Sequence, residues 1–337
     1  IAMKKLLSFC FVLSMVCMPM MGQVYLDAKA PIEDRIEDAL SRMTLREKIA
    51  IIHAQSKFSS PGVARLGIPG IWCTDGPHGI RPEVLWDEWN QAGWTNDSCT
   101  AYPALTCLAA TWNREMAKTY GVAIGEEARF REKDVLLGPG VNIYRSPLCG
   151  RNFEYMGEDP LLSSRTAVQY IKGVQSQGVM ATVKHFALNN QETNRFRSNS
   201  ILSERTLREI YLKGFRIVID EAEPASVMSS YNLLNGEHTS QREDLMETLL
   251  RQQWGFKGIV MSDWVVAGFQ SRKKYPSSCS NGCVKAGNDI MMPGNKTHYE
   301  NLVKALHGQT EQYPLSREEM EKCAARMVAF AWKFGNC

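Results

Sequence analysis

Apolar residues recur along the chain with a period of about 3.6, the spacing of one buried helix face. A helix should begin at Thr44, because Thr44 and Glu47 have the spacing of a capping box before such a stretch. Further helices are predicted over 113–132, over 160–177 with Asp159 as N-cap, from Ser203 onward, and over 244–253. The face of the helix after Ser203 that should pack on a sheet comprises Leu207, Ile210, Tyr211 and Phe215.

Short runs that are apolar throughout separate these helices. They lie at 70–74, 135–137, 179–183, 225–230, 258–262 and 289–292. Strands of this kind are buried on both faces, and a helix between each pair implies parallel pairing. The pattern therefore predicts an α/β fold, a (β/α)8 TIM-like barrel. A doubly wound open sheet is the alternative, but no GxGxxG or GxxxxGK[ST] motif follows an early strand, so nucleotide binding lacks support.

Composition and the first residues bear on location and partners. The 337 residues are 44% apolar and 22% charged, the profile of an ordinary soluble enzyme. The net charge of +3 comes from scattered basic residues, so nucleic acid is not an expected partner. Met3, Lys4 and Lys5 precede an apolar run, 6–18, that is too short to span a bilayer. We expect a signal peptide over 1–22, one catalytic barrel over 23–337, export to the periplasm or the extracellular space, and no membrane attachment after cleavage.

The cysteines bear on disulfides and on metal binding. An exported protein can form disulfides, and Cys279 and Cys283 are the favoured local pair, although the connectivity does not follow from sequence. A zinc site is the rival interpretation. It is weak, because the cysteines form no CxxC pair and no His lies at ligand spacing from them. We therefore expect no metal and no cofactor.

Reactive side chains follow four of the apolar runs. Asp75 follows the first, Lys184 and His185 follow another, and Tyr231 and Asp263 follow the next two. In a barrel these strand ends share one face, where active sites of barrels are built. The sequence thus predicts that the five side chains converge.

Each residue also has an ordinary structural explanation. Asp75 before a glycine can be a turn residue that bonds its own backbone. Lys184 and His185 can be solvated, and Tyr231 can be a core residue with a satisfied hydroxyl. Asp263 is harder to explain in this way, because an acid directly after a buried strand is costly unless it is paired or functional.

Longer motifs surround these groups. They are DGPHGIR at 75–81, GRNFE and GEDP within 138–160, KHFALNNQETNR at 184–195, MSSYN at 228–232 and SDW at 262–264. In this order, from about residue 36 to 293, they resemble the motifs of glycoside hydrolase family 3, specifically its β-glucosidase-like members. The resemblance implies a retaining β-glycosidase with Asp263 as nucleophile. It also implies a terminal-sugar pocket formed by Asp75, Arg81, Arg151, Lys184, His185, Met228, Tyr231 and Trp264.

Elementary chemistry is consistent with these roles. A carboxylate accepts two hydrogen bonds, so Asp75 suits two neighbouring sugar hydroxyls, with donors supplied by Arg151, Lys184 and His185. We expect these cations to hold Asp263 ionised. Trp264 is expected to stack on a pyranose ring. The tryptophans of one loop either stack too or only pack: Trp86, Trp89 and Trp94.

A retaining mechanism also needs an acid/base carboxyl group. The loop 186–195 contains neither Asp nor a second His, so it resembles two-domain β-glucosidases, whose acid/base Glu lies in an αβα sandwich domain after the barrel. We expect that domain to be absent from this chain, with a surface left for its docking. Substitute acids within the chain are Glu154, Glu158 and Glu192, although capping and Arg contacts explain them equally well.

Several functions remain open. The first is hydrolysis of terminal non-reducing β-D-glucosyl residues in a β-glucoside or oligosaccharide, and β-xylosidase action is its alternative. A carbohydrate-binding or inactive barrel without its acid/base is a second class. A metal-dependent barrel hydrolase is a third, but the six His residues include no HxH pair.

Overall fold

The structure is a computed structural model that describes residues 23–81, 98–267 and 277–335. The chain divides into two compact units, 1–43 and 44–337. The predicted signal peptide, 1–22, lies outside the described residues, as do Trp86, Trp89 and Trp94. Among the helices that are described, none has the length and apolar character to cross a membrane.

The first unit contains the short helix η1 (Val24–Leu26) and helix α2 (Ile32–Arg42). Asp38 of α2 accepts a hydrogen bond from the Tyr25 backbone N–H at 3.0 Å. Arg35 Nε donates to the Tyr25 carbonyl at 3.2 Å. These bonds hold η1 to α2.

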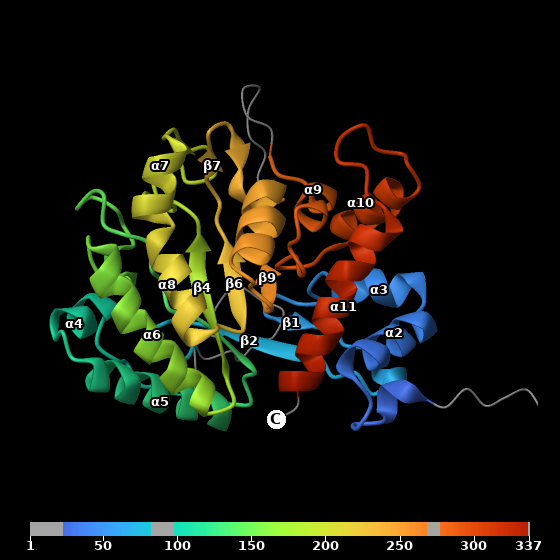
Figure 1. The fold of residues 1–337 in the computed structure, drawn as a ribbon, viewed down its shortest axis with the longest axis horizontal. Coiled ribbons are helices and arrows are strands. Elements are labelled where there is room, and N and C mark those ends of the chain that lie inside the picture. Colours follow the sequence, from blue (N-terminus) through green and yellow to red (C-terminus); the bar gives the residue numbers. More distant parts are fainter. Residues whose placement is uncertain (1–22, 82–97, 268–276, 336–337) are drawn as a thin grey trace, which may run out of the picture. The chain divides into compact units, whose positions relative to one another are not determined.

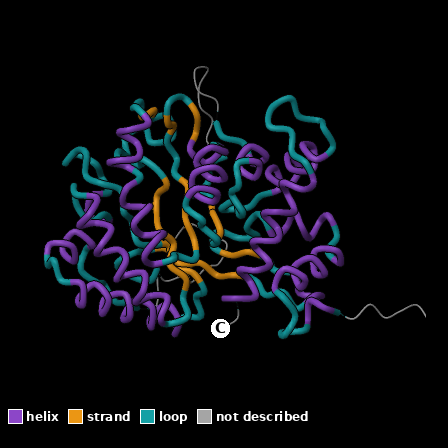
Figure 2. The backbone as a smooth tube through the Cα atoms, in the orientation of Figure 1, coloured by secondary structure: helices purple, strands orange, loops and turns teal. Residues whose placement is uncertain are grey.

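The second unit alternates strands with helices (Figures 1 and 2). Its strands are β1 (Ser59–Ser60), β2 (Ile71–Asp75), β3 (Val135–Leu137), β4 (Met180–Phe186), β5 (Asn199–Ser200), β6 (Ser226–Ser229), β7 (Leu233–Leu234), β8 (Glu237–His238) and β9 (Ile259–Met261). Its helical segments are α3 (Leu45–Ile51), η2 (Ala64–Leu66), α4 (Leu105–Ala110), α5 (Arg114–Phe130), η3 (Asn152–Glu154), α6 (Pro160–Ser176), α7 (Glu204–Thr206), η4 (Leu207–Tyr211), α8 (Lys213–Ala222), η5 (Thr239–Gln241), η6 (Asp244–Gln253), α9 (Ser280–Lys285), α10 (Lys296–Leu306) and α11 (Arg317–Phe334).

The larger sheet has the strand order β1-β2-β3-β4-β6-β9. Its strands β2, β3, β4, β6 and β9 run parallel to one another. Beyond β9, single parallel bridges join Met261 to Ile290 and His53 to Met291. The chain just after His53 then leads into β1. This arrangement agrees with a barrel-like α/β fold in which isolated bridges replace two full strands.

Two details differ from the predicted pattern. β1 is antiparallel to β2, because the short connection between them contains only η2, whereas a parallel crossover needs a dozen or more residues and usually a helix. The run 289–292 forms bridges rather than a strand. Its Met292 N–H donates to Ser262 Oγ at 2.8 Å, so a side chain takes the place of a ladder partner.

The predicted helices are largely confirmed. The capping box of Thr44 and Glu47 begins α3, Asn113 caps α5, and Asp159 caps α6. The prediction for Ile210 is wrong, because this side chain is 41% exposed. The Leu212 N–H bonds the Leu207 carbonyl five residues back at 2.9 Å, and this wider turn shifts the helix phase away from a 3.6 period.

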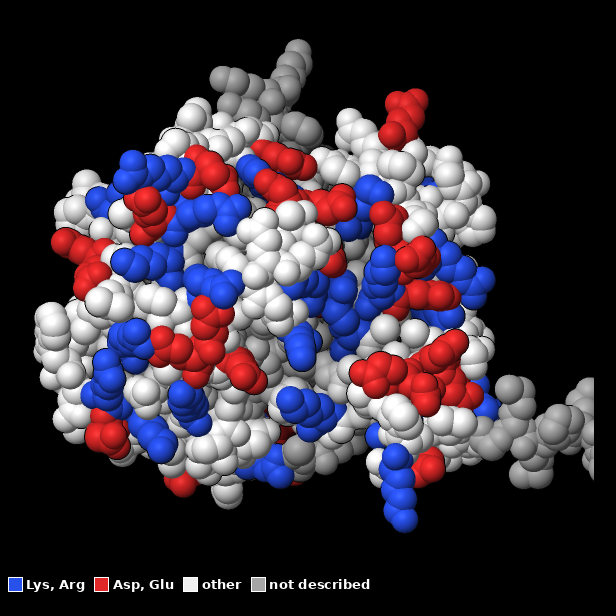
Figure 3. Space-filling model, viewed as in Figure 1, with Lys and Arg blue, Asp and Glu red and all other residues white. Residues whose placement is uncertain are grey.

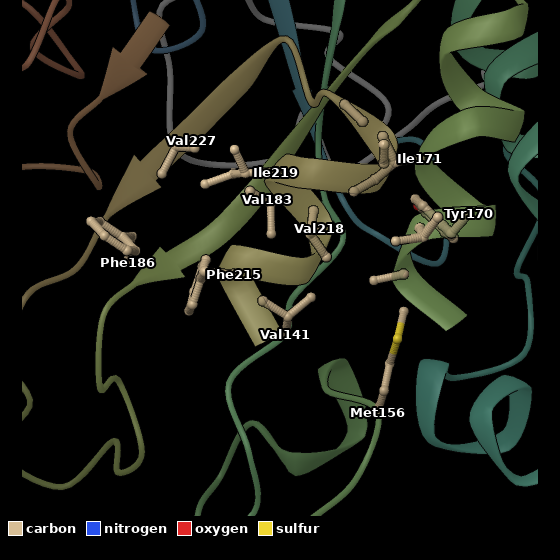
Figure 4. Packing of buried hydrophobic residues seen from close by; sticks show 14 of the residues in the cluster. Val141, Met156, Tyr170, Ile171, Val183, Phe186, Phe215, Val218, Ile219 and Val227 are labelled. Atoms are coloured by element: carbon tan, nitrogen blue, oxygen red, sulfur yellow. The ribbon is translucent and has the colours of Figure 1, made fainter. Parts of the chain in front are cut away.

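The core lies between the outer helices and the parallel strands. Figure 4 shows Val183 and Phe186 of β4 and Val227 of β6 facing Phe215 and Val218 of α8. Every residue of β3, β4, β6 and β9 is buried, as their apolar runs predicted. Side chains alternate along a strand. Lys184, which follows Val183, therefore faces the other side of the sheet, towards the end of strand β2.

Charged side chains of both signs occur on the surface. On the face drawn in Figure 3, Lys and Arg alternate with Asp and Glu over short distances. Elsewhere in the described residues, several oppositely charged side chains pair one helical turn apart, such as Arg216 with Asp220 at 2.6 Å. Exposed pairs of this kind add little to stability.

Candidate active site

Side chains at the carboxyl ends of three parallel strands, β2, β4 and β9, lie close together. Asp75 is the last residue of β2, and Lys184 and His185 lie near the end of β4. Lys184 Nζ is 3.4 Å from Asp75 Oδ1. His185 Nε2 is 3.7 Å from Oδ2 of Asp263, which follows β9. The predicted convergence is therefore observed, and the cause is the parallel order of the strands.

Asp263 is buried in this cluster, with 6% of its surface exposed. Its Oδ1 accepts a hydrogen bond from the Trp264 backbone N–H at 2.7 Å. Its Oδ2 is buried and accepts no hydrogen bond from the residues that the structure describes. Burial raises the pKa of Asp263 to about 6, against the opposing effects of Arg151, the Trp264 N–H and the Tyr231 hydroxyl. The carboxylate is therefore mostly ionised at neutral pH, with one oxygen free to react.

The expectation that cations decide the ionisation of Asp263 needs correction. Arg151 and Lys184 do lower its pKa, but the loss of hydration on burial has the larger effect. His185 is not a cation here, because burial lowers its pKa well below the usual range. The carboxylate is still ionised near pH 7, supported by Arg151 and Lys184 but not by His185.

A buried carboxylate links the two remaining cations. Glu154 Oε1 lies 2.7 Å from Lys184 Nζ, and its Oε2 accepts a hydrogen bond from Arg151 Nε at 2.7 Å. Although burial alone would raise the pKa of Glu154, the cations Lys184 and Arg151 lower it to about 2. Glu154 therefore does not serve as an acid at neutral pH, and its ion pairs explain why it was a poor candidate.

The other candidate acids have different surroundings. Glu192 Oε2 accepts a hydrogen bond from Arg195 Nη1 at 2.7 Å, and Glu192 Oε1 accepts one from Asn189 at 3.3 Å. It also lies 3.9 Å from Arg151, at the edge of the cluster. Glu158 is exposed on the surface. Glu192 is therefore engaged by Arg195 and Asn189, and Glu158 faces solvent.

His185 is fixed from several sides. Its backbone N–H donates to Asn142 Oδ1 at 2.8 Å, and Asn142 Nδ2 donates back to the His185 carbonyl at 2.9 Å. Its ring Nδ1 is 3.1 Å from the Tyr155 hydroxyl. The Asn189 side chain donates to the same hydroxyl at 3.2 Å. Sequence reasoning did not assign Tyr155 or Asn142 a role, although both lie within or beside the GRNFE motif region.

Tyr231 is buried beside Asp263, and its neighbours are aromatic and cationic. Burial and the Asp263 charge raise the pKa of Tyr231, so its hydroxyl is neutral and can donate to the carboxylate. The Arg195 guanidinium lies 4.4 Å from the Tyr231 ring centre, and the Phe196 ring lies 4.6 Å away. Arg195 and Phe196 therefore hold the Tyr231 ring, a function that the sequence motif did not reveal.

Trp264 and Arg81 meet across one aromatic ring. The Trp264 indole Nε1 donates to the Lys57 carbonyl at 2.7 Å, and its ring lies 5.3 Å from that of Phe58. The Arg81 guanidinium lies 5.0 Å from the same Phe58 ring. These contacts come from the segment before β1, so Phe58 and Lys57 join the site although sequence reasoning overlooked them.

Asp75 and Met228 complete the predicted set. Asp75 Oδ1 accepts the Gly76 backbone N–H at 2.9 Å, as a turn residue would. Its side chain is nevertheless 47% exposed and within reach of Lys184. Asp75 can therefore act both as a turn residue and as a carboxylate open to a ligand. Met228 is buried in β6 and pairs in register with Met261 of β9.

The cysteine prediction did not hold. Cys279 and Cys283 are both free, because Cys279 precedes α9 as its N-cap residue while Cys283 is buried inside that helix. Burial raises the pKa of the Cys283 thiol to about 12. Among residues 23–81, 98–267 and 277–335, no three His, Cys, Asp or Glu side chains are grouped to hold a metal ion.

Comparison with known proteins adds an independent finding. The chain is 58% identical over 244 residues to beta-glucosidase BoGH3A of Bacteroides ovatus, which covers 72% of this chain and 33% of that protein. It is 44% identical over 226 residues to an exo-alpha-(1->6)-L-arabinopyranosidase of Bifidobacterium breve, covering 66% of this chain and 29% of that protein. The structure of beta-glucosidase 3B from Thermotoga neapolitana in complex with alpha-D-glucose superimposes with a TM-score of 0.76 at 40% identity.

That superposition covers 87% of this chain and 42% of the Thermotoga chain. The chain thus spans about a third of the length of the curated relatives that it matches. The profile of the glycosyl hydrolase family 3 N terminal domain matches residues 15–330. Since this match extends over nearly the whole chain, the chain belongs to glycosyl hydrolase family 3, whose N terminal domain it contains.

Proposed function

We propose that this chain carries the nucleophile of a retaining β-glycosidase that removes terminal non-reducing β-D-glucosyl residues. The observation that carries the proposal is the Asp263 carboxylate, buried and ionised near neutral pH, with one oxygen bonded to the Trp264 N–H and the other free. In a retaining mechanism such an oxygen attacks the anomeric carbon as the glycosidic bond breaks, and water later releases the sugar from the ester.

The surrounding groups suit recognition of a sugar. Asp75 presents a partly exposed carboxylate that can accept hydrogen bonds from two neighbouring hydroxyls. Lys184 and Arg151 are held at fixed positions by Glu154, so their remaining N–H groups can donate without reorganisation. The relatives named as beta-glucosidases support glucose as the sugar.

We further propose that the acid/base is a Glu from a following αβα sandwich domain of the full-length protein. The support is chemical. Glu154 has a pKa of about 2, whereas a general acid needs a pKa near the working pH. If this part of the proposal is right, the chain alone cleaves substrates with good leaving groups far better than substrates with poor ones, because only the poor ones need protonation.

A 2-fluoro β-glucoside with a dinitrophenolate leaving group tests the nucleophile directly. We expect intact-mass spectrometry to show one added fluoroglucosyl group and peptide mapping to place it on Asp263. The Asp263→Asn variant should take up no label. The matched control Asp244→Asn removes an exposed carboxylate in η6 that pairs with Arg242, and it should label like the wild type.

The alternatives give different results. Glucose binding without an adduct, in both the chain and the full-length protein, would identify a carbohydrate-binding barrel instead. Turnover of the p-nitrophenyl β-xyloside or α-L-arabinopyranoside much faster than the glucoside by the full-length protein would change the sugar assignment. An adduct on any residue other than Asp263 would refute the assigned nucleophile.

A further inference from the structure

The His185 imidazole lies between two groups that compete for its single proton. Its Nε2 faces the free oxygen Oδ2 of Asp263 at 3.7 Å, and its Nδ1 faces the Tyr155 hydroxyl at 3.1 Å. The ring is neutral, so only one nitrogen carries a hydrogen. Since Asn142 fixes the backbone of His185 on both sides of the residue, the ring has little freedom to turn away.

Two arrangements of hydrogens are possible. In the first, the Tyr155 O–H donates to Nδ1, Asn189 Nδ2 donates to the Tyr155 oxygen, and the proton on Nε2 points to the Asp263 carboxylate. In the second, Nδ1 donates to Tyr155, whose own O–H turns to the Asn189 carbonyl at 3.4 Å. Both arrangements keep the 3.1 Å hydrogen bond between Nδ1 and the Tyr155 hydroxyl, with opposite direction. The second arrangement is disfavoured because it places the Nε2 lone pair against the lone pairs of the ionised Asp263 Oδ2 at 3.7 Å.

We propose that Tyr155 is a positioning residue that keeps the His185 proton on Nε2, directed at the proposed nucleophile Asp263. The Tyr155 side chain is suited to this because it is 1% exposed and ionises only well above neutral pH, since burial raises its pKa. Its hydroxyl therefore always has one hydrogen to donate. The inference rests on the proposed function for its catalytic meaning but not for the tautomer itself.

The Nε2–H stabilises the ionised form of Asp263. Arg151, the Trp264 backbone N–H, Tyr231 and Lys184 also face this carboxylate and act in the same direction against burial. If His185 loses its preferred tautomer, part of this stabilisation is lost and the carboxylate is protonated at higher pH. The effect is confined to the pH range in which Asp263 titrates, which separates it from a general loss of structure.

The tautomer is tested first, without any activity assay. Full-length protein labelled with 15N-histidine, with the His185→Gln variant used to assign the signal, should show His185 protonated on Nε2 and unprotonated on Nδ1 at about pH 7. The Tyr155→Phe variant should show a mixture of both tautomers. A wild-type spectrum with the proton on Nδ1 overturns the proposal.

The kinetic test compares Tyr155→Phe with Tyr120→Phe. Tyr120 is also buried and donates to a carbonyl, that of Pro103 at 2.8 Å, but on helix α5. For Tyr155→Phe we expect the acid limb of kcat/KM to move up by about 0.5 to 1 pH unit. The rate then falls up to about tenfold below the limb and changes little above it.

The control should show the wild-type profile. An equal loss of rate at every pH in Tyr155→Phe would mean a structural role and overturn the proposal. Failure of the proposed function gives a different result, because a protein that neither turns over glycosides nor forms the Asp263 adduct can still show the Nε2 tautomer.

Discussion

Replacement of Asp263 by Asn should stabilise the protein at alkaline pH. The carboxylate is buried among Arg151, Lys184 and Tyr231, yet its pKa rises from 3.8 to about 6. A raised pKa means that the folded state holds the proton more tightly than the unfolded chain. The ionised carboxylate therefore destabilises the fold above the folded pKa, and an uncharged Asn removes this cost.

The size of the effect follows from the pKa shift. Each pKa unit corresponds to about 1.4 kcal/mol, so the ionised form costs about 3 kcal/mol of folding free energy at about pH 8. Near pH 4 the folded carboxyl is already neutral, and the difference falls to about 0.6 kcal/mol. The gain from Asp263→Asn should therefore grow as pH rises through the interval between 3.8 and about 6.

Urea denaturation of wild type and Asp263→Asn at about pH 4 and about pH 8 measures this difference. The control Asp244→Asn should show no gain, because hydrogen bonding to Arg242 lowers the pKa of Asp244 and its charge favours the fold. Equal stability of Asp263→Asn and wild type at pH 8, or the same gain at both pH values, would refute this account of the buried charge.

Three further results are expected. The acid limb of kcat/KM for wild type should fall near pH 6, because activity needs ionised Asp263, and a limb below pH 4 in the pH–rate profile would contradict this. Glu154→Gln should shift that limb to lower pH, since Lys184 and Arg151 lose their anion, and should lower the free energy of unfolding by about 3 kcal/mol in urea; an unchanged profile and stability would contradict the role assigned to Glu154. Thr44→Ala should cost about 1 kcal/mol in thermal or urea denaturation through loss of the cap, with unchanged KM, and a KM effect would point to a role beyond capping.

Local features could be predicted because they depend on neighbours in sequence. Thr44 forms a capping box with Glu47 three residues on, and the side chains of Asn113 and Asp159 accept hydrogen bonds from backbone N–H groups two or three residues on. Apolar runs gave the buried strands, and the parallel order that they imply brought Asp75, with Lys184, to one edge. An Asn235-Gly236 hairpin between β7 and β8 was also readable from the dipeptide, but it was not predicted.

The electrostatics of the site depended on the tertiary structure. The sequence contains Glu154 and Lys184, but it does not show that they are close. Only the fold buries the two side chains and places their charged atoms 2.7 Å apart. Likewise, the net pKa of Asp263 reflects burial in competition with the charges of Arg151 and Lys184 and with two hydrogen bonds, all brought together by the fold. The cost of losing hydration depends on how deeply a group is buried, and the Coulomb energy depends on the distance between charges in space. The order of residues along the chain specifies neither quantity. Helix capping and strand periodicity, by contrast, depend only on residues a few positions apart.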